Sequence, residues 1–225
     1  MLVNADFSRV VIVTPHQYAW VPSPQPGVER VMLDRIGAEQ ARATSIVRYA
    51  PGSRFPRHAH PDGEEILVLS GIFSDEHGDF PEGWYLRNPP DSAHRPASRD
   101  GALIFVKLRQ MAPGETEPVR IDTRDRATWQ RRGDRAVCPL FAGEREQVCL
   151  QRVAPHAAIF PDAVDSAELL VLEGELLVEG RACARGAWIR LPAGRYPALV
   201  AGREGATFYL KTGQPGSANC LMPVG

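Results

Sequence analysis

Short apolar runs bounded by Pro or Gly dominate the chain, and several of them alternate apolar with polar residues. They recur every 10 to 20 residues, whereas stretches with helical periodicity are nearly absent. This pattern is typical of the strands of a β-barrel or β-sandwich. The exception, residues 120–133, is polar and rich in Asp and Arg, and we expect a linker or a short helical turn there. The predicted strands include residues 44–49, 65–69, 84–87, 102–108, 147–153, 169–172, 176–178, 187–191 and 207–210.

An internal repeat divides the chain into two parts. EILVLSG at residues 65–71 matches ELLVLEG at 168–174, a displacement of 103 residues. At the same displacement, GWYLRNPPDSAH at 83–94 matches GAWIRLPAGRYP at 186–197. Trp20 and Trp129 correspond more weakly. Repeats of this period indicate two copies of one β module. We therefore predict modules at residues 1–112 and 113–225, joined through the Pro- and Gly-containing segment near 110–120.

Composition excludes several classes of protein. The 225 residues include 44% hydrophobic and 24% charged residues, as in ordinary globular proteins. Lys and Arg number 26 against 27 Asp and Glu, a net charge of −1, so no basic surface for nucleic acid is expected. No run approaches the roughly 18 apolar residues of a membrane span, and the N-terminus lacks the pattern of a signal peptide. We therefore expect no membrane association and a cytoplasmic location.

The cysteines fit that expectation. They are widely spaced and form no CxxC pair, so free thiols, buried or half-buried, are the simplest interpretation. A disulfide or a metal-binding pair is the alternative. The four cysteines are Cys138, Cys149, Cys183 and Cys220.

Four of the six histidines fall within 37 residues of the first module: His58, His60, His77 and His94. His58 and His60 are two residues apart, so on a strand they face the same side. Glu64 keeps that parity if the segment stays extended, although the turn-like HPDGEE sequence could break it. His94 follows in a second turn-rich segment. Two imidazoles, a carboxylate and a distant third imidazole suit a divalent metal ion.

The spacing of these residues resembles the two cupin motifs. Gly52-(x)5-His58-x-His60-(x)3-Glu64-(x)6-Gly71 is similar to the first motif, and Gly83-(x)5-Pro89-x-Asp91-x-x-His94 to the second, with Asp91 where a Gly is usual. Residues 18–110 also resemble the cupin domain of ChrR-type anti-sigma factors. The resemblance implies a bicupin of two tandem jelly-roll (double-stranded β-helix) barrels. It also implies a metal inside the first barrel, held by His58, His60, Glu64 and His94.

The carboxylate ligand has two candidates, because cupins allow three or four residues between the second His and the Glu. Glu64 is preferred, since it leaves six residues before Gly71 and since Glu65 aligns with Glu168 of the second module. Ala167 then stands at the ligand position of that module.

The second module lacks the other ligands as well. Asp162 and Val164 stand in the region of the two histidines, and Pro197 stands at the third. The turn residues persist, so we interpret this module as a degenerate cupin. Another site made by His156, Asp162 and Glu168 is the alternative.

One divalent metal ion per chain is therefore predicted, with zinc as the first choice and iron, manganese or nickel as alternatives. Three functions fit such a site. The first is a metal-dependent dioxygenase-like enzyme for a small oxygenated compound. The second is a ChrR-like, non-catalytic zinc sensor with a regulatory protein partner, and the third is a binding or storage bicupin. The sequence assigns no catalytic residue and no organic cofactor, and it leaves a homodimer open.

Overall fold

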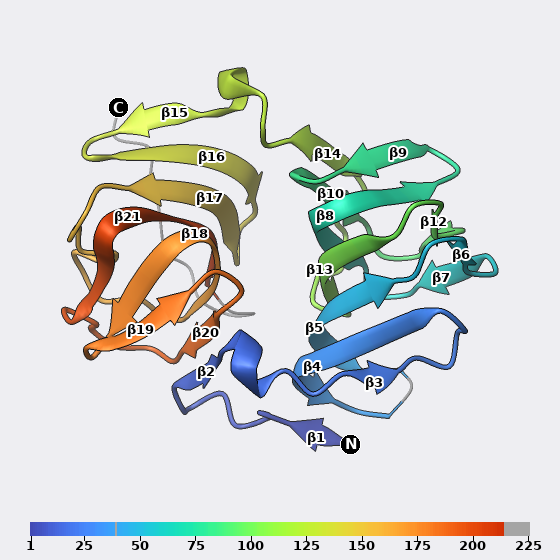
Figure 1. The fold of residues 1–225 in the computed structure, drawn as a ribbon, viewed down its shortest axis with the longest axis horizontal. Coiled ribbons are helices and arrows are strands. Elements are labelled where there is room, and N and C mark those ends of the chain that lie inside the picture. The colour runs from blue at the N-terminus through green and yellow to red at the C-terminus, as the bar shows by residue number, and fades with distance from the viewer. Residues whose placement is uncertain (39, 214–225) are drawn as a thin grey trace. The chain divides into compact units, whose positions relative to one another are not determined.

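The computed structural model describes residues 1–38 and 40–213, and within them the chain forms two compact units (Figure 1). The first unit contains Met1–Ala5 and Ala19–Arg124; the second contains Asp6–Tyr18 and the residues from Asp125 onward. The described residues include no α-helix, and their helical segments are the 3-10 turns η1 (Pro15–Gln17) and η2 (Arg126–Thr128). The prediction of an all-β protein is confirmed. None of the described helical segments could cross a membrane.

The first unit is built on one main sheet with the strand order β1-β4-β5-β13-β8-β10-β14, and β7 pairs with β11 in a separate small sheet. Its strands are β1 (Leu2–Val3), β3 (Val21–Pro22), β4 (Val28–Ile36), β5 (Arg42–Tyr49), β6 (Ser53–Arg54), β7 (His58–His60), β8 (Glu64–Asp75), β9 (Gly78–Pro81), β10 (Trp84–Asn88), β11 (Ser92–His94), β12 (Ala97–Ser98), β13 (Ala102–Leu108) and β14 (Val119–Asp122).

The second unit repeats this arrangement, with the order β15-β16-β17-β21-β18-β20-β2. Its central strands β16-β17-β21-β18-β20 follow one another as β4-β5-β13-β8-β10 do in the first unit. The sequence repeat is therefore a repeat of strand topology. The strands are β2 (Val11–Val13), β15 (Gln130–Arg132), β16 (Arg135–Ala142), β17 (Gln147–Val153), β18 (Ala167–Val178), β19 (Arg181–Ala184), β20 (Trp188–Leu191) and β21 (Leu199–Thr212).

The weak correspondence between two tryptophans has a structural counterpart. The guanidinium carbon of Arg48 lies 4.2 Å from the centre of the Trp20 ring, and that of Arg152 lies 4.8 Å from the centre of the Trp129 ring. Each unit thus keeps one cation–π pair on its second long strand.

Three details differ from the sequence-based expectation. The predicted strands 169–172 and 176–178 are one strand, β18, whose pairing with β21 shifts register on both sides of Gly174. The short helical turn expected at 120–133 is present as η2, but the segment also contains part of β14 and all of β15. β2, near the N-terminus, pairs with β20 of the second unit.

The core of the first unit lies on one face of its long strands. Ile66 and Val68 of β8 pack with Leu86 of β10 and with Ile104 of β13. Because side chains alternate along a strand, Glu64 belongs to the same inward row as Ile66 and Val68. The core of the unit therefore carries a carboxylate at the beginning of β8.

Gly71 allows β8 and β13 to approach closely. Its φ is +72°, and a Cβ there would collide with the carbonyl oxygen of Gly101. We predict that Gly71→Ala lowers the free energy of unfolding by about 1–3 kcal/mol more than Gly52→Ala does. Gly52 is the matched control, since its φ is +79° but nothing lies within 4 Å of its added Cβ. Urea unfolding checks the difference, and equal losses would contradict this role of Gly71.

Candidate metal centre

The three predicted histidine ligands converge because β7 and β11 pair in antiparallel register. His58 lies opposite His94, and His60 lies opposite Ser92. Alternation along β7 leaves Ala59 exposed, while His60 is buried and His58 half-buried. One ring nitrogen of each histidine lies within 4.8 Å of those of the other two. In the described residues this is the one group of three or more His, Cys, Asp or Glu side chains placed to hold a metal ion.

Glu64, and not Glu65, lies beside these imidazoles. Its Oε2 is 3.6 Å from His60 Nε2 and 3.3 Å from His94 Nε2. Glu65 is also buried, but its Oε2 forms an ion pair at 3.2 Å with Nη1 of Arg87. The turn between β7 and β8 therefore preserves the parity that the sequence left open, and adjacent glutamates take opposite faces of β8.

The outer nitrogens of two histidines have fixed partners. Nδ1 of His58 is 3.0 Å from the carbonyl oxygen of Pro56, and Nδ1 of His94 is 3.2 Å from Oδ2 of Asp75. A carbonyl accepts but does not donate, so Nδ1 of neutral His58 carries the proton. Nε2 then keeps its lone pair for a metal, which is the usual arrangement of metal-binding imidazoles.

A chain of hydrogen bonds holds the Glu64 carboxylate. Asn88 Nδ2 donates to Glu64 Oε2 at 2.9 Å, and Arg120 Nη2 donates to Asn88 Oδ1 at 2.5 Å. The pairing of β8 with β10 sets this contact, because Asn88 lies opposite Glu64. Sequence reasoning missed Asn88, which looked like part of a turn before two prolines, and it missed Asp75, which lies 19 residues from its partner His94.

Burial and nearby carboxylates shift the pKa values of the two buried histidines in opposite directions. Burial lowers the pKa of His60, although the Glu64 carboxylate opposes the shift. Burial also acts to lower the pKa of His94, but the hydrogen bond with Asp75 and the charge of Glu64 outweigh it and raise the pKa. A neutral imidazole is the form that binds metals, so the local environment favours that form at His60.

The departure from the second cupin motif has a backbone explanation. Asp91 stands where the family usually has Gly, and its φ is +63°. This left-handed conformation favours Gly, but Asp tolerates it better than most residues. The backbone N–H of Asp91 donates to the carbonyl oxygen of His60 at 2.9 Å. The substitution therefore keeps the turn that brings β11 beside β7.

Aromatic rings pack against one side of the histidine cluster. Phe55 lies 5.6 Å from His58 and Phe73 lies 6.1 Å from His94, measured between ring centres. Tyr49 contacts both phenylalanines, with centre-to-centre distances of 5.6 and 5.9 Å. His77, the fourth histidine of the group at residues 58–94, is exposed in the turn between β8 and β9. The cluster thus has an apolar wall, and the half-buried His58 marks its contact with solvent.

These residues fit a divalent transition-metal ion. Three imidazoles and one carboxylate are suitable for zinc, iron, manganese or nickel. The buried donors converge, and their partners Asp75 and Asn88 supply the outer hydrogen bonds that such ligands need.

The second unit has an alanine where the first unit has the Glu64 carboxylate. β18 begins at Ala167 opposite Thr212, just as β8 begins at Glu64 opposite Leu108. Glu168 is engaged elsewhere, since its Oε1 accepts a hydrogen bond from Trp188 Nε1 at 2.7 Å. Cys138, Cys149 and Cys183 are buried free thiols, while Cys220 lies outside the described residues.

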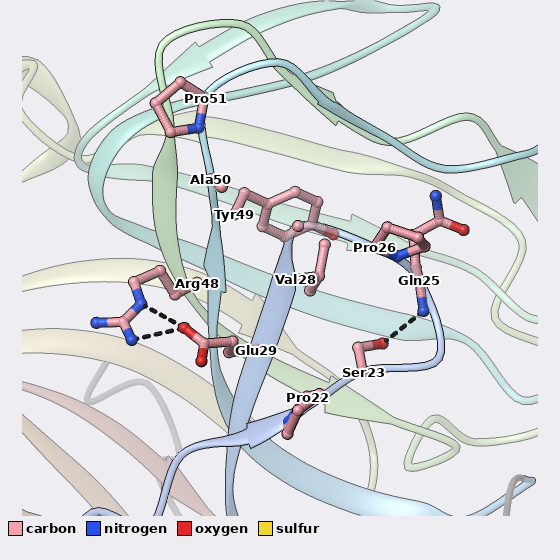
Figure 2. Close-up of a pocket in the computed structure, with 11 residues that line it drawn as sticks. Pro22, Ser23, Gln25, Pro26, Val28, Glu29, Arg48, Tyr49, Ala50 and Pro51 are labelled. Atoms are coloured by element: carbon pink, nitrogen blue, oxygen red, sulfur yellow. Dashed lines mark hydrogen bonds and ion pairs between the residues drawn. The ribbon is translucent and has the colours of Figure 1, made fainter.

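A hollow of about 570 Å³ also occurs in the first unit, lined by residues of β3, β4, β5 and the adjoining turns (Figure 2). Its charged residues are Glu29 and Arg48, which pair with each other at 2.6 Å. Arg48 is half-exposed and already paired. None of the four predicted ligands lines this hollow.

Comparison with known proteins supports the resemblance seen in the sequence. Residues 8–112 match the family model of the ChrR cupin-like domain, so the predicted resemblance is confirmed for this part of the chain. None of the curated proteins matches the chain significantly.

Solved structures extend the fold similarity beyond this segment. A candidate dioxygenase from Nostoc punctiforme has a TM-score of 0.76 at 12% identity, with 96% of this chain and 88% of that chain covered. Ylba from Escherichia coli has a TM-score of 0.69 at 14% identity, covering 96% and 95%. A bacterial pirin, YhhW of Escherichia coli, solved in complex with nickel(II), has a TM-score of 0.62 at 12% identity, covering 92% and 100%. At these identities the similarity concerns the fold.

The hydrogen bonds of the outer nitrogens predict specific tautomers. In the metal-free protein, the neutral rings of His58 and His94 should carry their protons on Nδ1, because Pro56 and Asp75 accept them. Two-dimensional ¹H–¹⁵N spectra of the imidazoles distinguish the two tautomers. Exposed His16 provides the reference, and Nε2-protonated His58 would contradict this arrangement.

Proposed function

We propose that the first unit contains the single metal site of a dioxygenase-like enzyme, and that the enzyme acts on a small oxygenated compound. His58, His60, Glu64 and His94 would hold the ion. The observation that carries the proposal is the convergence of three imidazoles whose ring nitrogens lie within 4.8 Å of one another, beside a buried carboxylate. The candidate dioxygenase among the proteins of similar fold agrees with this proposal.

The surrounding residues would prepare the site before any substrate arrives. A bound divalent ion supplies Lewis acidity and, if it is redox-active, the activation of dioxygen. Asn88, itself bonded to Arg120, keeps the Glu64 carboxylate oriented. Asp75 fixes the ring of His94. Phe55 and Phe73 exclude water from one side, while a substrate could approach beside half-buried His58.

The proposal includes the architecture around the site. We interpret the two modules predicted at residues 1–112 and 113–225 as tandem cupin barrels, the first with the metal and the second without one, although Asp6–Tyr18 folds with the second unit. The repeated strand order and the missing ligands of the second unit support this interpretation. The proposal also includes a cytoplasmic location and a small-molecule substrate. It includes no nucleic-acid partner. Self-association into a homodimer is compatible with it.

A second candidate function is supported by the family match. ChrR-like domains are named after a regulator, and residues 8–112 match their model. Four protein ligands can close the tetrahedral shell of zinc, which would give a sensory site that passes its signal to a protein partner. The two functions differ in whether the loaded site reacts with dioxygen.

Metal content tests the ligand assignment. Purified protein should contain one divalent ion per chain by mass spectrometry, and His58→Ala/His60→Ala should lose it because two of four donors are removed. Asp75→Asn should weaken binding by about 10- to 100-fold, since it changes the partner of a ligand. His16→Ala is the matched control, because His16 is exposed and outside the cluster. Two ions per chain would contradict the degenerate second unit.

Oxygen consumption separates the enzyme from the sensor. We expect protein loaded with Fe(II) to consume dioxygen with acetylacetone or catechol, and zinc-loaded protein to be inactive, because zinc has no accessible redox chemistry. His58→Ala/His60→Ala should abolish the activity. Tight zinc binding without oxygen consumption under any loading, together with a co-purifying transcription regulator, would instead favour the sensor.

A further inference from the structure

A cavity of about 470 Å³ lies inside the second unit. Strands β16, β17 and β21 and the segment 159–164 form its walls. The apolar part of the lining comes from Val137, Ile159, Phe160 and Leu210, all of which are buried. Cavities of this size with mostly apolar walls are typical of sites for small molecules.

In the second unit, the cavity lies at the end of the sheet that corresponds to the position of the histidine cluster in the first unit. Thr212 and Val164 line it. Thr212 lies opposite Ala167, at the register position that Leu108 and Glu64 hold in the first unit. Val164 bridges to Gly194 much as His60 pairs with Ser92. Two of the ligand positions thus hold Ala167 and Val164, which are small or apolar and leave space, while Asp162 near a third position is exposed and lines the cavity.

One buried amide in the cavity has an unused donor capacity. Gln151 is 7% exposed, and its Oε1 accepts a hydrogen bond from Arg135 Nη1 at 3.1 Å. Among the described residues, its Nε2 makes only a 3.7 Å contact with Cys149 Sγ, which is a weak acceptor. A buried amide N–H with so weak a partner is stabilised when a ligand oxygen accepts a hydrogen bond from it, which favours binding of that ligand.

The charges around the cavity balance. Its lining contains the cations Arg132 and Arg135 and the anions Asp134 and Asp162. Arg135 is engaged with Asp134 through Nε at 3.0 Å and with the carbonyl oxygen of Ile159 at 2.9 Å. Burial raises the pKa of the Cys149 thiol to about 11, so this wall is uncharged at neutral pH. The lining therefore suits a neutral molecule.

We infer that the second unit binds a neutral, largely apolar small molecule, such as an aryl ketone, with one oxygen that accepts a hydrogen bond from Nε2 of Gln151. This site is separate from the proposed metal site and does not depend on it. It also gives the second unit a function of its own, where the loss of metal ligands alone would suggest a structural role.

Two probes of nearly the same shape test the inference. Acetophenone carries the acceptor oxygen and ethylbenzene lacks it. Titrated into the full chain and followed by methyl NMR, both should bind once per chain, ethylbenzene about 2- to 12-fold more weakly, the equivalent of one net hydrogen bond of 0.5–1.5 kcal/mol. Gln151→Met should abolish this difference while ethylbenzene binding persists.

Substitutions at exposed alanines control for folding. Ala163→Trp, on the lining, should weaken both probes, whereas Ala184→Trp on the edge strand β19 should leave them unchanged. The inference is overturned if neither probe binds, if binding survives Ala163→Trp, or if His58→Ala/His60→Ala abolishes it. A variant Gln151→Met that binds both probes with the original difference would remove the role of Gln151. If Gln151→Met does not fold, the comparison of Ala163→Trp with Ala184→Trp still tests whether the probes bind in this cavity.

Discussion

The buried carboxylate of Glu64 is the group on which the first unit's site depends. A carboxylate inside an apolar core is costly unless hydrogen bonds or charges compensate it. Here the Asn88 amide donates to Oε2, and the protonated form of His94, whose Nε2 lies 3.3 Å from the same atom, places a positive charge beside it. This compensation requires β8 and β10 to pair with Glu64 opposite Asn88, and a shift by one residue would place Glu65 in the interior instead. Strand register and site chemistry are therefore inseparable in this unit.

The second unit shows what the same strand order does without that carboxylate. Ala167 begins β18 where Glu64 begins β8, and Val164 stands near the position of His60. With no carboxylate at this position, the interior contains an apolar cluster and a cavity of about 470 Å³. The same strand topology thus surrounds a cluster of metal-binding side chains in one unit and an apolar cavity in the other. Function therefore depends on the side chains placed on the scaffold and not on the fold itself.

Much of this organisation is predictable from sequence because it follows from local periodicity. The two-residue spacing of His58 and His60 fixes their common face, and the repeat predicts the equivalence of Glu64 and Ala167. The contacts of Asp75 and Asn88 could not be predicted, because they depend on how hairpins pair rather than on any local pattern. The pairing of β2 with β20 was also inaccessible, since it joins residues far apart in the chain that no repeat relates.

The central claim is that one ion occupies the histidine cluster of the first unit. Anomalous diffraction from crystals of the purified protein, collected at the absorption edge of the metal that mass spectrometry identifies, tests it most directly. We predict one peak per chain, at about 2.0–2.2 Å from a ring nitrogen of His58, His60 and His94 and from a carboxylate oxygen of Glu64. A cluster without a peak, or a peak at the cavity of the second unit, would contradict the account.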